Sequence, residues 1–301
     1  MAAVPFPIQN IPYNRGTGPR RYGLSLEFLN KEELMNLFNA ILLGIVEGLA
    51  EFIPVSSTAH MLIVQKILNI PADNGVFAFL ILVQIGPLVA LLFYFWKDYW
   101  ALIQAFFARP FSTPENRMAW YIIIASIPAG LAGLLLKDAV QNLFQNPLME
   151  AAIRLFTAAI LLFLAEWLGK RTRTLASITW LDSLIIGLFQ VLAVFPGSSR
   201  SGSTIPGGML RQFDRPSATR FSFLMAAPVM LAAGAYETLS VLKMHILGSI
   251  LGPLAVGFVV AAILGWLSIR WLITYVSHHS LNLFAIYCAI VAALCVVFLF
   301  V

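Results

Sequence analysis

Long apolar runs constrain this 301-residue chain more than any other feature. They cover residues 76–96, 118–136, about 149–168, 221–242, about 248–275 and 281–301. Each run has the length that a helix needs to cross a bilayer, which is roughly 20 residues. Hydrophobic residues form 60% of the chain and charged residues 11%, whereas soluble domains are about half apolar and a quarter charged. The sequence therefore predicts an all-α integral membrane protein.

The net charge and the two cysteines argue against nucleic-acid binding and against a cysteine metal site. We interpret the net charge of +5 as an unequal distribution of Lys and Arg between the two sides of a membrane. No basic stretch has the interleaved aromatic residues of a nucleic-acid surface. We expect no nucleic-acid partner. Cys288 and Cys295 lie seven residues apart in an apolar run and form no metal-type cysteine pattern. We expect both to fill apolar space.

Two further apolar regions, about 36–68 and about 180–210, do not read as simple spans. Each begins like a helix and then breaks at a proline and a cluster of Ser, Gly and Thr. Irregular backbone at membrane depth is tolerated only where protein or a water-filled cavity surrounds it. We therefore expect two re-entrant helix–loop–helix segments, each entering and leaving the membrane on one side.

The two broken regions also resemble each other. Gly44 aligns with Gly187, Glu47 with Gln190, and Pro54 with the proline at 196. The chain is therefore predicted to contain two repeats, each with one re-entrant segment and three transmembrane helices. Three crossings place the second repeat upside down relative to the first, and in such inverted-topology repeats a site forms near the midplane, where broken helices meet.

The predicted boundaries follow from this repeat. Residues 1–35 form a Pro/Gly/Arg tail, residues 36–168 the first repeat and residues 177–301 the second. With this topology one side of the membrane carries most of the Lys and Arg residues between 97 and 270, and that side should be cytoplasmic. The termini then face outward, although the basic residues of the tail argue against that orientation.

Glu47 and Glu51 are the first chemical signal, in EGLAEFIPVSSTAH (47–60). Their spacing places both carboxylates on one helix face. In a low-dielectric setting such a pair holds either a shared proton or a divalent cation. A solvated charged face is the alternative, and the apolar surroundings disfavour it.

Hydroxyl and imidazole groups follow in the same segment. Ser56, Ser57 and Thr58 can bind a ligand, but capping of the second half-helix would alone explain a Ser/Thr run. His60 can serve as an acid/base group or nucleophile, and its alternative is a histidine bonded to backbone. Gln84 and Gln190 are amides at membrane depth that could line the same cavity.

The second broken region reads PGSSRSGST (196–204), and its residue types suit phosphate. Glycines allow backbone N–H groups to approach an anion, and an arginine fork matches phosphate oxygens. The predicted binding residues are Gly197, Ser198, Ser199, Arg200, Ser201, Gly202 and Thr204. The alternative for Arg200 is a structural ion pair with Glu47 or Glu51.

Acid/base or metal groups facing a phosphate cradle inside a membrane suggest hydrolysis of a lipid-linked phosphate. Arg200 would stabilise charge on the transferred phosphoryl group. Glu47 and Glu51 would hold a divalent cation such as Mg²⁺ or Ca²⁺. His60 would act as general acid/base or nucleophile, and Ser57 is the rival nucleophile. Direct attack of water on the phosphorus is a further alternative.

EGLAEFIPVSSTAH (47–60) and PGSSRSGSTIPGGML (196–210) together resemble the paired motifs of bacterial undecaprenyl-diphosphate phosphatases of the bacitracin-resistance family. The resemblance covers about residues 36–301. It departs at Ala59, where the family pattern usually has Gly, and a residue with a Cβ would be strained there if φ is positive.

The resemblance implies removal of the terminal phosphate of undecaprenyl diphosphate, which regenerates the carrier for cell-wall synthesis. It also implies a divalent-cation requirement, an inner-membrane location, a site open to the outer face, and functional roles for Glu47, Glu51, Ser57, His60 and Arg200. We expect prenyl diphosphate and membrane lipids as partners, and a homodimer as one state of the protein. Two other hypotheses are a transporter or flippase of the lipid phosphate and a purely structural membrane subunit.

Overall fold

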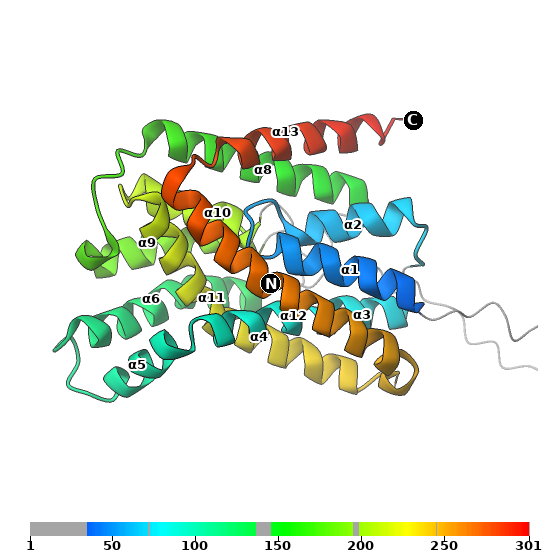
Figure 1. Ribbon diagram of the computed structural model, residues 1–301, viewed down its shortest axis with the longest axis horizontal. Coiled ribbons are helices and arrows are strands. Elements are labelled where there is room, and N and C mark those ends of the chain that lie inside the picture. Colours follow the sequence, from blue (N-terminus) through cyan, green and yellow to red (C-terminus); the bar gives the residue numbers. More distant parts are fainter. Residues whose placement is uncertain (1–34, 72, 137–145, 195–198, 245, 301) are drawn as a thin grey trace, which may run out of the picture.

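The computed structural model describes residues 35–71, 73–136, 146–194, 199–244 and 246–300, and within these ranges the chain is helical apart from turns and one isolated bridge. The predicted all-α fold is confirmed (Figure 1). The elements are α1 (Leu37–Ala50), α2 (Ser57–Ile67), α3 (Asn74–Val83), α4 (Ile85–Tyr94), α5 (Trp96–Phe106), α6 (Pro114–Leu135), α8 (Pro147–Leu168), η2 (Leu175–Ser177), α9 (Trp180–Val191), α10 (Arg200–Leu210), α11 (Arg215–Leu242), α12 (Leu247–His278) and α13 (Asn282–Val297).

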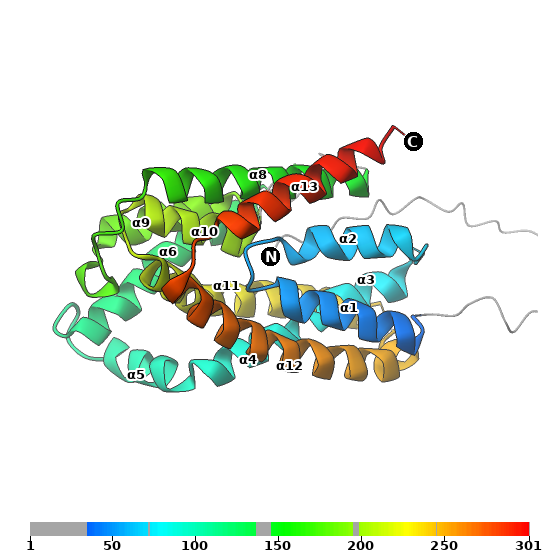
Figure 2. The same ribbon diagram turned by 45° about the horizontal axis from the view of Figure 1, so that its top comes forward.

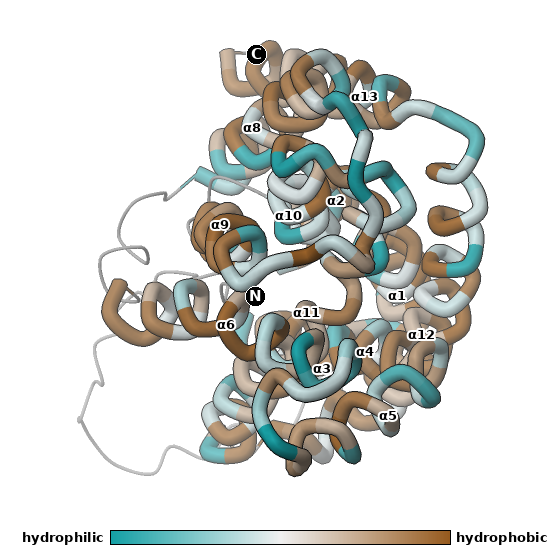
Figure 3. The backbone as a smooth tube through the Cα atoms, turned by 90° about the vertical axis from the view of Figure 1, so that its left-hand side faces the viewer, coloured by the Kyte–Doolittle hydropathy of each residue, from teal (hydrophilic) through white to brown (hydrophobic). Residues whose placement is uncertain are grey.

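Five helical segments of the described chain are long and apolar enough to cross a membrane: α3 with α4, α6, α8, α11 and α12. Their outward faces carry large apolar side chains, as Ile127, Leu131 and Leu134 do on α6. Figure 3 shows α6 as a largely hydrophobic tube at the periphery. The chain is therefore a multi-pass membrane protein. The run predicted at 281–301 forms α13, which has 16 residues and is shorter than a full span.

Two stretches differ from the sequence-based expectation. The run 76–96 is broken at Gln84, whose backbone N–H bonds to Leu82 instead of continuing the α-helical pattern. The polar stretch 97–117, which the predicted apolar runs leave as a connection between two spans, contains α5. Tyr99 and Leu102, three residues apart on α5, pack against the core, so an amphipathic helix forms despite the polar residues between them.

Both predicted helix–loop–helix segments are present as helical hairpins, α1 with α2 and α9 with α10. Met35 and Ile70 lie in one apolar cluster, so the two outer ends of the first hairpin are close. Figures 1 and 2 show these ends on the opposite side of the molecule from the connection that leads into α9. The inverted relation between the two repeats stays a prediction.

The aligned glycines Gly44 and Gly187 both allow close packing of two helices. A Cβ on Gly44 of α1 would lie 2.6 Å from the carbonyl oxygen of Gly257 on α12. A Cβ on Gly187 of α9 would likewise collide with the backbone of Ala125 on α6. Each glycine thus lets the first helix of its hairpin approach a spanning helix closely.

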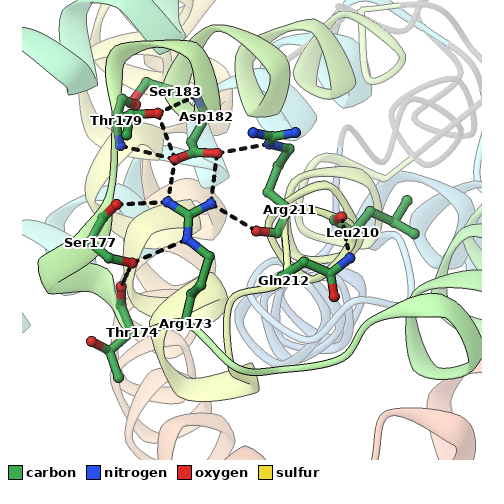
Figure 4. Close-up of polar contacts among 9 residues, drawn as sticks. All are labelled: Arg173, Thr174, Ser177, Thr179, Asp182, Ser183, Leu210, Arg211 and Gln212. Carbon is green, nitrogen blue, oxygen red and sulfur yellow. Dashed lines mark hydrogen bonds and ion pairs between the residues drawn. The ribbon is translucent and has the colours of Figure 1, made fainter.

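A buried carboxylate links the start of α9 to the end of α10, which together form the open end of the second hairpin (Figure 4). Asp182, fully buried at the start of α9, accepts hydrogen bonds from Arg173 at 2.7 and 3.0 Å and from the Arg211 Nε at 2.7 Å. Thr179 and Asp182 form a capping box at the start of α9. The connections before α9 and after α10 are therefore held against each other.

Candidate active site

The tips of the two hairpins meet inside the helical bundle. Ser201, in the first turn of α10, lies 3.5 and 3.3 Å from the carbonyl oxygens of Glu51 and Ile53 in the α1–α2 turn. Phe52 of that turn is fully buried and packs edge-to-face on Phe223 of α11, with ring centroids 5.3 Å apart. The broken backbone is thus surrounded by protein, as the membrane setting requires.

Glu51 is the centre of this contact. It follows α1 directly, one turn after Glu47, and keeps a helical backbone. Its Oε2 accepts a 2.6 Å hydrogen bond from the Ser57 hydroxyl, and its Oε1 accepts a 3.1 Å bond from Arg200 Nη2. The side chains of Arg200 and Glu51 are only 7% and 10% exposed. One carboxylate therefore joins a hydroxyl of the first hairpin to the guanidinium of the second.

Two polar atoms beside this junction have no hydrogen-bond partner within the described parts of the chain. They are Oε1 of Glu47 and Nη1 of Arg200, and both are buried. Glu47 is 1% exposed and lies within electrostatic reach of Glu51 and Arg200. Buried polar groups are normally bonded, so unpaired ones at the hairpin junction indicate a place for a ligand.

Both ring nitrogens of His60 are bonded to groups other than the Ser57 hydroxyl. Its Nδ1 lies 2.8 Å from the Ser56 carbonyl oxygen, which only accepts, so Nδ1 carries the proton in the neutral ring. Nε2 then accepts the 2.7 Å bond from the Tyr287 hydroxyl on α13, whose ring stacks on the imidazole with centroids 5.6 Å apart. Ser56 presents its carbonyl from an unusual backbone conformation with φ 69°.

Several predicted binding hydroxyls have structural partners. Ser56 and Ser199 cap α2 and α10 by accepting from Ala59 and Gly202 backbone N–H groups. Thr204 lies 2.9 Å from the Arg200 carbonyl oxygen and 2.5 Å from the Ser222 hydroxyl. The capping alternative therefore holds for Ser56 in this arrangement. Ser199 caps α10 in the same way, and the roles of both residues in binding stay predictions.

Glycine and alanine at two motif positions have packing explanations. A Cβ on Gly202 would lie 2.9 Å from Ser199 Cβ and 3.1 Å from Ala158 Cβ, so close contact with α8 requires Gly there. Ala59 lies inside α2, fully buried and without a positive φ, so its side chain is not strained. Gly197 and Ser198 lie outside the described residues.

The predicted glutamines occupy different places. Gln84 lies at the α3–α4 break, where its Nε2 donates to the Leu80 carbonyl oxygen at 3.0 Å, and it lines a small cavity with Glu47 and Thr58. Gln190 is buried on α9 at the position that aligns with Glu47, and neither polar atom of its amide has a partner in the described ranges.

Comparison with known proteins places the chain in a family. The model of the family described as bacitracin resistance protein BacA matches residues 40–294. The chain belongs to the BacA family. It is 42% identical to the undecaprenyl-diphosphatase of Chlorobium phaeobacteroides (strain BS1) over 266 residues, which cover 84% of this chain and 93% of the relative. Two further undecaprenyl-diphosphatases are similar: 38% identity for that of Corynebacterium striatum (88% of this chain, 95% of the relative) and 36% for that of Methanosphaera stadtmanae (88% and 98%).

In this BacA family member, the metal prediction rests on Glu47 and Glu51. Glu47 fits a metal ligand, because its buried Oε1 is unpartnered. Both oxygens of Glu51 are bonded to Ser57 and Arg200. Among the described residues no three His, Cys, Asp or Glu side chains are grouped as a metal cluster, so further ligands would have to be amide, hydroxyl or substrate oxygens.

Two residues beside the candidate site were not predicted from the sequence. Tyr287 lies in a plain apolar run, 227 positions from His60, and no local pattern marks it. Gln65 lies two turns after Thr58 on α2, buried and with its Oε1 unpartnered in the described chain. A polar side chain on the buried face of a helix at membrane depth was the available signal for Gln65.

Proposed function

We propose that this protein hydrolyses undecaprenyl diphosphate to undecaprenyl phosphate and inorganic phosphate, and so recycles the lipid carrier for cell-wall synthesis and contributes to bacitracin resistance. Family membership and relatives named undecaprenyl-diphosphatase at 36–42% identity support this function. The protein is an enzyme, a membrane phosphatase. No finding favours the transporter or flippase alternative.

The observation that carries the proposal is the double bonding of Glu51. Its carboxylate holds the Ser57 hydroxyl and the Arg200 guanidinium at 2.6 and 3.1 Å, inside an apolar bundle. A hydroxyl bonded to a carboxylate is the arrangement of a nucleophile with its base. An arginine with a buried, unpartnered Nη1 suits a phosphate oxygen. Attack and charge stabilisation can therefore occur within one site.

The geometry favours Ser57 over His60 as the nucleophile. The Ser57 oxygen attacks the terminal phosphorus and passes its proton to Glu51, while the bond from that phosphorus to the bridging oxygen breaks and undecaprenyl phosphate leaves. Water then hydrolyses the phosphoserine, which releases phosphate and restores Ser57. Arg200 stabilises the negative charge of both transition states. Direct attack by water, with Glu51 as base, is the competing route.

The remaining groups support this step. The unprotonated Nε2 of His60 accepts from the Tyr287 hydroxyl, so His60 can exchange a proton with the site through that hydroxyl. A divalent cation, Mg²⁺ or Ca²⁺, held by Glu47 would neutralise part of the diphosphate charge. The amide of Gln190, which has no partner in the described part of the chain, can donate to the ligand from the second hairpin.

We further propose a bacterial inner-membrane location with the site open to the outer face. The connections α5–α6 and α8–α9 lie at one end of the molecule (Figure 1), and they contain Arg109, Lys170, Arg171 and Arg173. Positive charge concentrates on the cytoplasmic side of membrane proteins. The start of α1 and the end of α2 then face the outer side of the membrane. A homodimer stays a prediction.

The test is phosphate release from a prenyl diphosphate by purified protein in detergent. Wild type should release phosphate with Mg²⁺ and lose activity with EDTA. Glu51→Gln and Arg200→Ala should lose activity by a factor of about 100 or more, because they remove the base or the charge stabilisation. If folded wild type released no phosphate but moved labelled lipid phosphate across vesicles, the transporter reading would replace this one.

A further inference from the structure

One turn of α11, the contact turn (residues 222–224), reaches the arginine of the candidate site through side chains. The Ser222 hydroxyl lies 2.5 Å from the Thr204 hydroxyl on α10. Thr204 donates to the Arg200 carbonyl oxygen at 2.9 Å, so Ser222 donates to Thr204. The contact turn is therefore bonded to the first turn of α10, which carries the guanidinium that binds Glu51.

The contact turn also touches the first hairpin. The Phe223 ring packs edge-to-face on Phe52 of the α1–α2 turn, with centroids 5.3 Å apart. Phe52 follows Glu51 directly, and the centroid of its ring lies 6.0 Å from the Arg200 Cζ atom. A displacement of the contact turn would therefore move Arg200 and Glu51 relative to each other.

A proline interrupts the backbone hydrogen bonds of α11 at this turn. Pro228, four residues after Leu224, has no N–H and cannot donate to the Leu224 carbonyl oxygen as a helix requires. Leu224 is only 3% exposed, which limits the access of water to that carbonyl. In membrane proteins a carbonyl freed by proline is satisfied by a side chain or a neighbouring helix. The contact turn therefore needs a donor from outside α11.

Helix α5 supplies a donor through Tyr99. The Tyr99 hydroxyl lies 3.4 Å from the Leu224 carbonyl oxygen and 3.3 Å from that of Phe223. Both distances exceed the roughly 2.8 Å of a single hydroxyl bond, as expected for one proton shared between two acceptors. The Tyr99 and Phe223 rings both pack edge-to-face on Phe95, each with its centroid 6.4 Å away. Tyr99 is thus held against the contact turn by its ring and by its hydroxyl.

The neighbouring residue of α5 contacts the same part of α11. Asp98 accepts a hydrogen bond from Nη2 of Arg220, which lies about one turn before the end of the contact turn. The Arg220 Cζ atom also lies 5.7 Å from the centroid of the Phe95 ring. Both charged side chains are partly exposed, so their ion pair orients α5 and adds little stability. Asp98 and Tyr99 therefore fix α5 on the segment of α11 that holds the site.

We propose that Tyr99 is a positioning residue of the active site. Its hydroxyl replaces the N–H that Pro228 lacks and fixes the contact turn against both hairpin tips, so that the groups around Glu51 stay aligned. The inference rests on the proposed function, because this alignment is measured as the rate of phosphate release. The alternative is that Tyr99 only stabilises the docking of α5, and the two roles predict different kinetics.

Tyr99→Phe removes the hydroxyl and keeps the ring. We expect kcat for phosphate release to fall about tenfold, because small displacements of reacting groups lower the rate steeply. KM should stay within about twofold of the wild-type value, since no group that binds the lipid phosphate is removed. A lower unfolding temperature with wild-type kcat would overturn the proposal and leave Tyr99 with a structural role alone.

A second variant restores the missing N–H from within α11. Pro228→Ala provides an N–H for the Leu224 carbonyl oxygen, so the Tyr99 hydroxyl becomes dispensable. In that background Tyr99→Phe should lower kcat by less than about twofold, because the two groups serve one acceptor. A loss that stays about tenfold would contradict the proposal. The comparison is between two ratios, so an effect of Pro228→Ala alone cancels, and if that variant does not fold, the kcat of Tyr99→Phe decides.

Tyr94→Phe is the matched control. Tyr94 lies at the end of α4 and also packs on Phe95, with ring centroids 4.9 Å apart. Its hydroxyl takes no part in the bonds to the contact turn, which come from Tyr99. We therefore expect wild-type kcat in Tyr94→Phe, and an equal loss of kcat in both variants would overturn the role given to Tyr99.

Hydrogen exchange in detergent separates this inference from the proposed function. The backbone amides of residues 219–230 should exchange faster in Tyr99→Phe than in wild type or Tyr94→Phe, because the contact turn loses its external donor. If wild type releases phosphate and Tyr99→Phe keeps its kcat, the function stands and the positioning role fails. If exchange rises in Tyr99→Phe but wild type releases no phosphate, the bond to α11 stands and the proposed function fails.

Discussion

At the residue scale, the bonding of Glu51 explains why two distant motifs must come together. Arg200 is separated from Glu51 by 149 positions, yet its Nη2 lies 3.1 Å from the Glu51 Oε1. The ion pair foreseen for Arg200 is present, and it leaves Nη1 unpartnered among the described residues. Arg200 can therefore hold the two hairpins together and bind a ligand at the same time, because its planar guanidinium has several donors.

Tyr287→Phe tests the contact that fixes His60. The variant removes the hydroxyl that donates to His60 Nε2 at 2.7 Å and retains the stacked ring. We expect kcat for phosphate release to fall about tenfold, the equivalent of roughly 1.4 kcal/mol and of one net hydrogen bond, while KM stays constant.

Tyr121→Phe on α6 is the control for that variant, because it removes a tyrosine hydroxyl from another helix. The unfolding temperature should stay the same in both variants. A Tyr287→Phe enzyme with wild-type kcat, or one that loses only stability, would show that Tyr287 does not position His60.

The charged and hydroxylated residues of the candidate site could be proposed from sequence, because polar residues in apolar runs are costly and therefore informative. Glu47, Glu51, Ser57 and Arg200 belong to this class. Tyr287 could not be predicted, since an amphipathic aromatic residue is ordinary in a membrane helix and its partner is remote in sequence. The different hydrogen-bond partners of Ser57 and His60 also required the structure, because Ser57 bonds Glu51 whereas His60 bonds the Ser56 carbonyl oxygen and the remote Tyr287 hydroxyl.

At the element scale, the apolar runs predicted the spanning helices because hydrophobic length is set by bilayer thickness. The break at Gln84 was not predicted, although Gly86 and Pro87 follow it and both disfavour a continuous helix, Pro87 because it lacks the N–H that would bond to the Val83 carbonyl. Helix α5 was missed because its polar residues resemble those of a loop, while its core contacts through Tyr99 and Leu102 follow helical spacing.

Gly44→Ala tests the close approach of α1 to α12. The added methyl group would lie 2.6 Å from the Gly257 carbonyl oxygen, so the two helices must separate. We expect a loss of about 1–3 kcal/mol in the free energy of unfolding, by analogy with overpacked cores, visible as a lower unfolding temperature in detergent.

Gly130→Ala on α6 is the matched control, because an added Cβ there meets nothing within 4 Å. Removing a glycine from a helix should leave stability unchanged or raise it by up to about 1 kcal/mol. Equal unfolding temperatures for Gly44→Ala and wild type would contradict the packing role given to Gly44.

At the scale of the whole molecule, two helical hairpins reach into one bundle and their tips share a carboxylate. The Asp182 cluster closes the outer end of the second hairpin. Burial would raise the pKa of the Asp182 carboxyl, but hydrogen bonds from Arg173, Thr179 and Arg211 hold that pKa well below its usual value. The carboxylate is therefore a source of stability that depends on pH.

The direction of this dependence follows from the lowered pKa. Asp182 contributes its full stabilisation above the unfolded-state pKa of about 3.9 and loses it as pH falls from there toward the folded-state value. The unfolding temperature of wild type should thus drop between about pH 4 and pH 3, and Asp182→Asn should start lower and drop less. Glu115→Gln, at an exposed position, is the control. A steep acid loss that persists in Asp182→Asn would contradict the assignment.

Orientation is tested by labelling from outside intact cells. Lys66→Cys at the outer end of the first hairpin should react with an impermeant maleimide, and Lys170→Cys in the α8–α9 connection should react only after the membrane is opened. Both lysines are exposed, and the two natural cysteines are buried and should stay silent. The reverse labelling pattern would contradict the proposed orientation.

The most direct test of a single site built from both hairpins is a double-mutant cycle on kcat/KM for phosphate release. Glu51→Asp and Arg200→Lys shift the two groups without deleting their charges. Because the pair acts as a unit, the double variant should lose little more activity than the worse single variant. Losses that simply multiply would mean that Glu51 and Arg200 act independently, and the shared site would be wrong.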